Sequence, residues 1–212
     1  MTIGIIDYGV GNIGSVMGAM STIGVLARVV DSPKHMSDCD GLILPGVGSF
    51  KECMESLSYN GWSVEIVNQV RNHEKPLLGI CLGMQLLADF GWEGSLNNVP
   101  VQGLGLIPGE VKCLTDFGVK HRLPHVGWNN VHFRHGGSSM FDGIEQDQDF
   151  YFVHSYAFDC ESMDTVTATV DYDVVFPVSI CHQNIWGVQF HPEKSSKVGL
   201  KLLGNFARLC RC

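Results

Sequence analysis

The sequence has 212 residues, of which 45% are apolar and 17% charged, and its formal net charge is −8. This composition excludes a disordered chain, and no apolar run reaches the ~18 residues that a membrane span needs. The acidic balance, with no cluster of Lys and Arg, argues against nucleic acid and anionic membrane surfaces as partners. No basic segment precedes Asp7, so we predict no signal peptide and expect a cytoplasmic location.

The eight cysteines are spread along the chain without a Cys-x-x-Cys pair. We interpret most of them as buried, small apolar residues in a reducing compartment. Cys210 and Cys212 lie near the end and are expected to be exposed tail residues. A zinc site needs paired ligand spacing that this sequence does not show, so neither a metal nor a cofactor is predicted.

The first half alternates short apolar runs with segments of helical periodicity. The runs predict strands at 3–7, 25–30, 40–44 and 76–80. The periodic segments predict helices at 12–23, 49–58, 62–73 and 82–90. Strands separated by helices imply parallel crossovers. The predicted fold class is therefore α/β, with a mostly parallel sheet flanked by helices.

The second half is rich in β segments. A Gly-, Asn- and Pro-rich loop is predicted at 91–105, and a final helix at 196–208. Strands are predicted at 110–114, 128–133, 150–158, 165–172, 174–181 and 185–190. They indicate an added antiparallel region or an extension of the first sheet, and Pro177 indicates an edge position or a bulge. No linker or repeat interrupts the chain, so residues 1–212 are expected to form one domain.

Gly9, Gly11 and Gly14 form a G-x-G-x-x-G pattern between the first strand and the first helix. Asp31 ends the second strand, which is the form of a dinucleotide-binding fingerprint. However, Asp7 at the end of the first strand would place a carboxylate beside the pyrophosphate. We therefore favour a tight glycine turn that begins a helix.

The sequence Gly79-Ile80-Cys81-Leu82-Gly83 lies between a predicted buried strand and a predicted helix. A nucleophile elbow has this form, because flanking glycines permit close approach of the backbone. A helix start favours the thiolate and offers N–H groups to a developing oxyanion. The alternative is a buried cysteine at a helix start, and we favour Cys81 as a nucleophile.

A histidine and a glutamate follow the last predicted strand as His191-Pro192-Glu193. A cysteine hydrolase needs a base that takes the thiol proton and returns it to the leaving amine. A carboxylate that fixes the imidazole tautomer assists that base. His125 and His154, which also flank apolar β segments, are the competing candidates for the base.

The G-I-C-L-G-M-Q and G-V-Q-F-H-P-E segments together are similar to those of class I (triad) glutamine amidotransferases. Further segments resemble the branch of that family that serves histidine biosynthesis, and the resemblance runs from residue 3 to about 207. These segments begin at Asp7, Leu44, Pro124 and Tyr151. They also argue against the dinucleotide interpretation. The resemblance implies a single-domain class I glutamine amidotransferase fold.

The resemblance implies a role for each matching residue. Cys81 would attack the glutamine amide, His191 would act as base and then acid, and Glu193 would orient the imidazole. The oxyanion donors would be the Leu82 N–H and the Val47 or Gly48 N–H. The residues expected to hold glutamine are Gln85, His154, Ser155 and Tyr156.

The resemblance further implies a heterodimer with a cyclase subunit that is a (βα)8-barrel. Ammonia would pass through the barrel to a ribonucleotide intermediate, and imidazole glycerol phosphate would be formed. The residues expected to face that partner are Asn12, Trp128, Tyr151 and Lys194.

Other functions remain open from the sequence. Paralogous glutaminase subunits supply ammonia to a sugar amidotransferase in bacterial surface-polysaccharide pathways. A non-catalytic regulatory module of the same fold is a second alternative, which the intact Cys81, His191 and Glu193 disfavour. A cysteine peptidase is a third, which Gln85 and Tyr156 disfavour.

Overall fold

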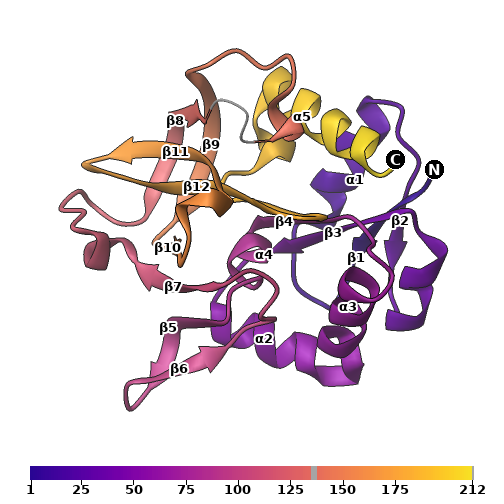
Figure 1. Cartoon of the computed structure of the whole chain (residues 1–212), viewed down its shortest axis with the longest axis horizontal. Coiled ribbons are helices and arrows are strands. Elements are labelled where there is room, and N and C mark those ends of the chain that lie inside the picture. The colour runs from indigo at the N-terminus through magenta and orange to yellow at the C-terminus, as the bar shows by residue number, and fades with distance from the viewer. Residues whose placement is uncertain (135–137, 212) are drawn as a thin grey trace.

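The computed structural model of the chain describes residues 1–134 and 138–211. Within these ranges the strands form a nine-stranded sheet and a four-stranded sheet. Helices cover both faces of the large sheet (Figure 1). No helix in the described part is long and apolar enough to span a membrane. The expectation of an exposed Cys210 is wrong, because the last helix packs this residue into the apolar core, where its thiol donates to the Phe206 carbonyl. Cys212, also expected in the exposed tail, lies outside the described residues.

The large sheet joins a parallel half to an antiparallel half. Its order is β2 (Ala27–Val30), β1 (Ile3–Ile6), β3 (Gly41–Gly46), β4 (Leu77–Cys81), β13 (Ile185–Val188), β12 (Val174–His182), β11 (Val166–Tyr172), β8 (His125–Phe133) and β9 (Gln148–His154). The pairs from β2 to β13 are parallel and the pairs from β13 to β9 are antiparallel. The predicted α/β class is confirmed. Most strands of the second half extend the first sheet, and the others belong to the separate four-stranded sheet.

Two apolar clusters fill the layers on either side of this sheet. Because side chains alternate along a strand, Ile3 and Ile5 join one cluster whereas Ile6 joins the other. The first cluster packs under α1 (Ile13–Thr22) and α5 (Ser196–Leu209). The second packs under α2 (Phe50–Ser58), α3 (Trp62–Arg71) and the short α4 (Leu82–Gln85). Figure 1 shows α1 and α5 on the side opposite to α2 and α3.

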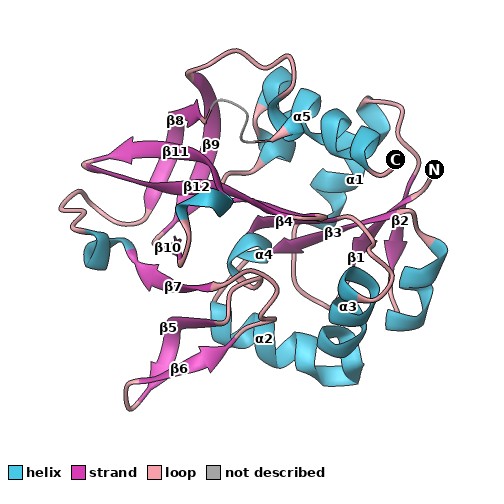
Figure 2. Ribbon diagram, in the orientation of Figure 1, coloured by secondary structure: helices cyan, strands magenta, loops and turns pink. Residues whose placement is uncertain are grey.

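The small sheet lies below the antiparallel half, beside α2 (Figure 2). Its order is β10 (Tyr156–Cys160), β7 (Gly109–Cys113), β5 (Phe90–Leu96) and β6 (Val99–Gln102). Short 3-10 helices lie between the longer elements, at Pro33–Asp38, Tyr59–Gly61, Leu114–Phe117, Ser139–Phe141, Met163–Thr165 and Pro192–Lys194. The sheet therefore places β5 and β10 along one side of the elbow that follows β4.

The helix predicted at 82–90 is wrong beyond its first turn. Leu87 and Ala88 donate to carbonyls three residues back, at Met84 and Gln85, so the chain tightens into turns. The Asp89 N–H then donates to the Gly109 carbonyl at 3.0 Å. From Phe90 onward the chain continues as β5, which pairs with β7 in the small sheet. The tertiary pairing overrides the local helical pattern.

The loop predicted at 91–105 is also wrong, because it contains the hairpin of β5 and β6. Asn97 and Asn98 form its two-residue turn, with φ of 54° and 56°. Asparagine tolerates this left-handed conformation, which a tight hairpin turn requires at both central residues. The Asn-Asn pair between Leu96 and Val99 was the sequence signal for the hairpin.

The strand predicted at 150–158 divides at Ser155 into β9, in the large sheet, and β10, in the small sheet. Pro177 is not on an edge, since β12 lies between β13 and β11. The register with β11 shifts beside it, where Thr169 pairs with Pro177 and Ala168 with Ser179. The bulge interpretation of Pro177 is confirmed. β3 also continues to Gly46, two residues beyond the predicted end.

Candidate active site

Cys81 is the last residue of β4, and Leu82 begins α4 directly after it. Its φ of 54° and ψ of −112° are unusual for a residue with a side chain. Glycines allow the sharp turn: a Cβ on Gly83 would collide with the Leu44 carbonyl, and one on Gly79 would lie 2.6 Å from the Gly83 oxygen. The predicted elbow is therefore present, and it places the thiol at the carboxyl edge of the parallel strands.

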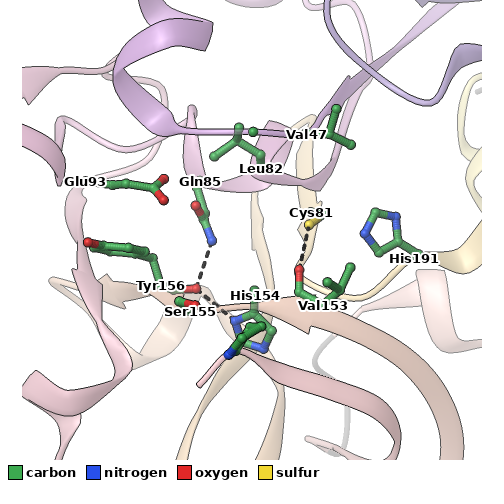
Figure 3. Close-up of a pocket in the computed structure, with 12 residues that line it drawn as sticks. Val47, Cys81, Leu82, Gln85, Glu93, Val153, His154, Ser155, Tyr156 and His191 are labelled. Atoms are coloured by element: carbon green, nitrogen blue, oxygen red, sulfur yellow. Dashed lines mark hydrogen bonds between the residues drawn. The ribbon is translucent and has the colours of Figure 1, made fainter. Parts of the chain in front are cut away.

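His191 reaches the same edge because β13 is the parallel neighbour of β4. Its Nδ1 lies 2.8 Å from Glu193 Oε1, and both side chains are almost wholly buried. The carboxylate accepts a hydrogen bond from the Nδ1–H, which leaves Nε2 to act toward the pocket. Nε2 is buried without a hydrogen-bond partner among the described residues, and the ring lies beside the Cys81 sulfur (Figure 3).

The environment of His191 favours its charged form. Burial disfavours the imidazolium, but the interactions of the ring with the neighbouring Cys81 and with Glu193 outweigh it and raise the pKa of His191 to about 9. The ring is therefore a good proton acceptor for the thiol. It also retains a proton that a leaving amine can take.

Ser195 fixes the backbone of His191. Its Oγ donates to the His191 carbonyl at 2.6 Å and accepts from the Tyr151 N–H at 3.0 Å. The His191 N–H in turn donates to the Tyr151 carbonyl at 2.9 Å. Sequence reasoning missed Ser195, because a serine after a short turn carries no distinguishing pattern. It is fully buried and ties His191 to β9.

A pocket of about 290 Å³ opens at Cys81. It is lined by Val47, Gly48, Cys81, Leu82, Gln85, Glu93, Pro124, Val153, His154, Ser155, Tyr156 and His191. Figure 3 shows Cys81 and His191 at one end and Glu93 with Gln85 at the other. The pocket thus has a nucleophilic end and a polar end, which suits a small, extended, zwitterionic substrate.

The Gln85 side chain is held by its own amide hydrogens. Nε2 donates to the Tyr156 carbonyl and to Gln189 Oε1, both at 2.8 Å. These two bonds use both hydrogens of the Gln85 amide nitrogen. Oε1 is therefore the polar atom that remains, and it can accept a hydrogen bond. Gln189, which is fully buried and was not singled out from the sequence, donates from Nε2 to the Cys81 sulfur at 3.7 Å.

Glu93 supplies a carboxylate to the polar end and was missed because residues 91–105 were interpreted as a loop. Burial raises the pKa of its carboxyl group, while a hydrogen bond from the Phe50 N–H lowers it. That bond is 2.8 Å long. A carboxylate and the Gln85 oxygen together make this end a site for a cationic head group.

The segment from Pro45 to Gly48 borders the nucleophilic end. Val47 and Gly48 both line the pocket, and Gly48 has a φ of 94°, which glycine adopts without strain. Cys53 in α2 donates its thiol to the Val47 carbonyl at 3.3 Å. In this conformation the carbonyl of the Val47–Gly48 peptide is held by Cys53, a residue beneath the loop.

His125 and His154, the competing candidates for the base, are unsuited to that role. Burial lowers the pKa of His125 to about 4 and that of His154 to about 3. Nδ1 of His125 bonds Nε2 of His154 at 3.0 Å, and His154 Nδ1 bonds the Tyr156 carbonyl at 2.8 Å. Both rings are neutral and engaged within the protein. Of these three histidines, only His191 has a ring nitrogen left for the thiol.

Three of the residues expected to face a partner lie together. Trp128 pairs with Tyr151 across β8 and β9, with ring centroids 6.0 Å apart, and Lys194 Nζ lies 5.9 Å from the Tyr151 ring. Asn12 precedes α1, which packs against the 3-10 turn that carries Lys194. Trp128 is 53% exposed and the neighbouring Val126 is 55% exposed. This surface beside the pocket is apolar for a solvent-facing edge.

The glycine-rich turn after β1 does not hold an anion site. The Gly9 N–H donates to Asp7 Oδ1 at 3.1 Å, so a side chain of the same turn already uses a loop donor and adds negative charge. Gly9 and Gly11 have φ of 95° and 139°, as the favoured tight turn requires. Among the described residues no three His, Cys, Asp or Glu side chains are grouped to hold a metal ion.

The family model for class-I glutamine amidotransferases matches residues 4–209. The imidazole glycerol phosphate synthase subunit HisH of Moorella thermoacetica is 47% identical over 209 residues, which are 99% of this chain and 95% of that protein. The subunit of the same name from Desulfitobacterium hafniense is 43% identical over 206 residues, covering 97% and 93%. The HisH 1 subunit of Campylobacter jejuni is 44% identical over 208 residues, covering 98% and 100%.

Solved structures share the fold at lower identity. A crystal structure described as a glutamine amidotransferase superposes with a TM-score of 0.76 at 19% identity, covering 99% of both chains. One chain of the PurLQS structure from Thermotoga maritima gives a TM-score of 0.76 at 15% identity, covering 98% of both chains. These two similarities concern the fold alone.

Proposed function

Because the chain belongs to the class-I glutamine amidotransferase family, we propose that its pocket hydrolyses glutamine to glutamate and ammonia with Cys81 as the nucleophile. The observation that carries this proposal is the strained Cys81 elbow beside the buried His191–Glu193 pair. The enzyme is the glutaminase subunit of an imidazole glycerol phosphate synthase, in histidine biosynthesis.

The reaction follows from the positions of three side chains. His191 takes the Cys81 proton, and the sulfur attacks the carbon of the glutamine side-chain amide. The carbon–nitrogen bond then breaks, and ammonia leaves with the proton returned by His191. Water, deprotonated by the same ring, adds to the thioester and releases glutamate. Glu193 keeps the Nδ1 proton in place and stabilises the imidazolium.

The oxyanion of each tetrahedral intermediate needs two donors. The Leu82 N–H directly follows the nucleophile, where such elbows place one donor. The second is the N–H of Val47 or Gly48, across the pocket. One such donor contributes on the order of 10²–10³ in rate, so the orientation of this loop governs turnover.

The polar end of the pocket orients the substrate. Glu93 and Gln85 Oε1 receive the α-ammonium group, and the Ser155–Tyr156 segment borders the rest of the amino-acid head. An extended glutamine then places its side-chain amide at Cys81. The distribution of charge supports glutamine over a peptide, because a peptide offers no cationic α-ammonium group at this position.

The partner is a (βα)8-barrel cyclase subunit that binds as a heterodimer on the face carrying Trp128, Tyr151, Lys194 and Asn12. Ammonia in water at pH 7 is protonated and loses its nucleophilicity, so a dry route into the barrel favours the second reaction. The exposed apolar edge beside the pocket supports this docking face.

The relatives' names favour the histidine pathway over a surface-polysaccharide pathway. A regulatory module without catalysis is disfavoured by the intact triad geometry.

We treat residues 1–212 as one domain, since the family match spans residues 4–209. A cytoplasmic location is supported by the free thiols of Cys39, Cys53, Cys81, Cys113, Cys160 and Cys181.

The test is release of glutamate from glutamine, measured for the chain alone and for its complex with the barrel subunit in the presence of the acceptor nucleotide. Wild type should turn over, and Cys81→Ala should not. Cys181→Ala, which removes a thiol outside the pocket, should behave as wild type. Glutamate release by Cys81→Ala would overturn the assignment of the nucleophile.

A further inference from the structure

A series of hydrogen bonds runs from β8 to the nucleophile, through His125 and His154, two buried histidines that have no part in the proposed proton transfers. Asn129 Nδ2 lies 3.3 Å from His125 Nε2, and His125 Nδ1 lies 3.0 Å from His154 Nε2. His154 Nδ1 lies 2.8 Å from the Tyr156 carbonyl, which also accepts from Gln85. Gln85 also donates to Gln189, which in turn donates to the Cys81 sulfur.

The Tyr156 carbonyl determines which atom donates and which accepts in each hydrogen bond between His154, His125 and Asn129. A carbonyl can only accept, so His154 Nδ1 carries a proton and donates to Tyr156. A neutral His154 then accepts at Nε2, and His125 must donate from Nδ1. His125 Nε2 is left as an acceptor for the Asn129 amide. Both rings therefore hold the Nδ1–H tautomer.

The surroundings keep both rings neutral and in place. His125 is stacked between Phe152 and Tyr172, with ring centroids 4.7 Å and 4.1 Å away. His125 and His154 are directly paired across β8 and β9 and are 3% and 6% exposed. Burial lowers the pKa of both, and the nearby His191 further disfavours charge on His154.

We propose that His125 and His154 are a neutral positioning pair that sets the specificity of the glutamine pocket. His154 holds the Tyr156 carbonyl, which holds one hydrogen of Gln85 Nε2, and Gln189 holds the other. Gln85 is thereby fixed with Oε1 as its remaining polar atom. The pair makes Gln85 an acceptor for the α-ammonium group, although neither histidine bonds the substrate through a ring nitrogen.

This inference rests on the proposed glutaminase reaction, and its first test uses steady-state kinetics of the complex with the barrel subunit. His154→Leu removes the donor to Tyr156 and should raise KM for glutamine about tenfold or more, with kcat within about threefold. His154→Asn places an amide N–H near the Nδ1 position and should recover most of the loss. His125→Phe keeps the stacking and should raise KM less than His154→Leu.

The matched control is His132→Leu, which removes another histidine of β8 that pairs with Asp147 at the surface. It should leave KM unchanged. Equal effects of His154→Leu and His154→Asn, or a loss confined to kcat, would overturn the positioning role. If His154→Leu does not fold, His125→Phe still tests the positioning role: it should raise KM for glutamine above the value for His154→Asn, and a loss confined to kcat would overturn the role.

A second readout does not depend on activity. Nitrogen NMR spectra of the wild-type chain at pH 6 should show both rings neutral, with the proton on Nδ1. A charged ring or an Nε2 proton on His154 would contradict the proposal even if glutamine is hydrolysed. A wild type that shows the expected tautomers but releases no glutamate would instead contradict the proposed function alone.

Discussion

Two histidines that line the pocket, His191 and His154, have opposite electrostatic environments. Burial opposes a charge on His191, but its thiol and carboxylate neighbours outweigh burial and raise its pKa to about 9. Burial also opposes a charge on His154, which gains only a backbone acceptor and another imidazole, so its pKa falls to about 3. The same residue type is therefore a base in one place and a fixed donor in the other. The neighbours decide the role.

The raised pKa of His191 makes a direct prediction for its titration. In wild type the ring signal should titrate near pH 9, and in Cys81→Ala the midpoint should fall because the interaction of the ring with the Cys81 sulfur, which raises the pKa of His191, is lost. The folded-state pKa exceeds the unfolded value of about 6.5. The protonated ring therefore stabilises the fold fully below pH 6.5, and this contribution is lost as pH rises through about 9.

NMR titration of the imidazole carbons measures this midpoint. An unshifted midpoint in Cys81→Ala would mean that the thiol does not couple to the ring.

Replacement of the base and of its orienting carboxylate should differ in severity. His191→Ala should reduce kcat by about 10⁴ or more, since no other ring nitrogen of the described pocket faces the thiol. Glu193→Gln should cost less than His191→Ala, because the base remains but its tautomer and charge are no longer fixed. Single-turnover rates of thioester formation give the comparison. A larger loss in Glu193→Gln would reverse the two roles.

Close contacts between elements hold the catalytic groups in register. α5 starts directly after the His191–Lys194 turn, and a Cβ on Gly199 would collide with the Pro192 carbonyl. Only glycine lets the first turn of α5 lie against the residue that joins His191 to Glu193. Gly79 and Gly83 of the elbow likewise allow close contacts between β3, β4 and α4 that a Cβ atom would prevent.

Gly199→Ala should lower both the midpoint of thermal unfolding and the glutaminase rate, because the Pro192 backbone must shift. Gly204→Ala is the control on the same helix, since its nearest neighbour would be Ile23 Cδ1 at 4.0 Å. It should be neutral or stabilise by about 0.5–1 kcal/mol, as alanine is the better helix former. Equal behaviour of the two variants would show that the contact at Gly199 does not constrain the site.

The parallel half of the sheet could be predicted because its strands are short apolar runs, three of which, β1, β3 and β4, are followed by glycine-rich turns. Cys81, His191 and Glu193 could be predicted because they follow such strands. Glu93 was missed because β5 alternates weakly between buried and exposed residues and the Asn-Asn signal of its hairpin was overlooked; only the tertiary fold brings this carboxylate to the pocket of Cys81. Ser195 and Gln189 could not be predicted, since their roles come from neighbours that only the tertiary fold supplies.

At the scale of the whole molecule, one edge of the sheet serves two purposes. β8 and β9 carry His125 and His154 on the buried side and Val126, Trp128 and Val153 on the exposed side. The strands that shape the glutamine pocket are thus the strands that a partner would cover. The net charge of −8 favours a partner with basic residues at the rim.

The isolated chain should hydrolyse glutamine slowly, and the barrel subunit should stimulate it, because docking selects one orientation of the loop at Val47. Association should weaken as salt rises. Lys194→Ala should reduce the stimulation more than the basal rate, whereas Lys34→Ala, beyond the opposite sheet edge, should not. Turnover titrated with the barrel subunit measures both. Full activity of the chain alone would show that docking is not needed to select the active orientation of the loop at Val47.

In the proposed reaction sequence, ammonia is made at Cys81 and consumed in the partner. The most direct measurement is product formation by the complex of Cys81→Ala with the barrel subunit, using glutamine or an ammonium salt as the nitrogen source. We expect no product from glutamine and a rate close to that of wild type from the ammonium salt. Product from glutamine, or loss of the ammonium-dependent rate in a correctly assembled complex, would contradict it.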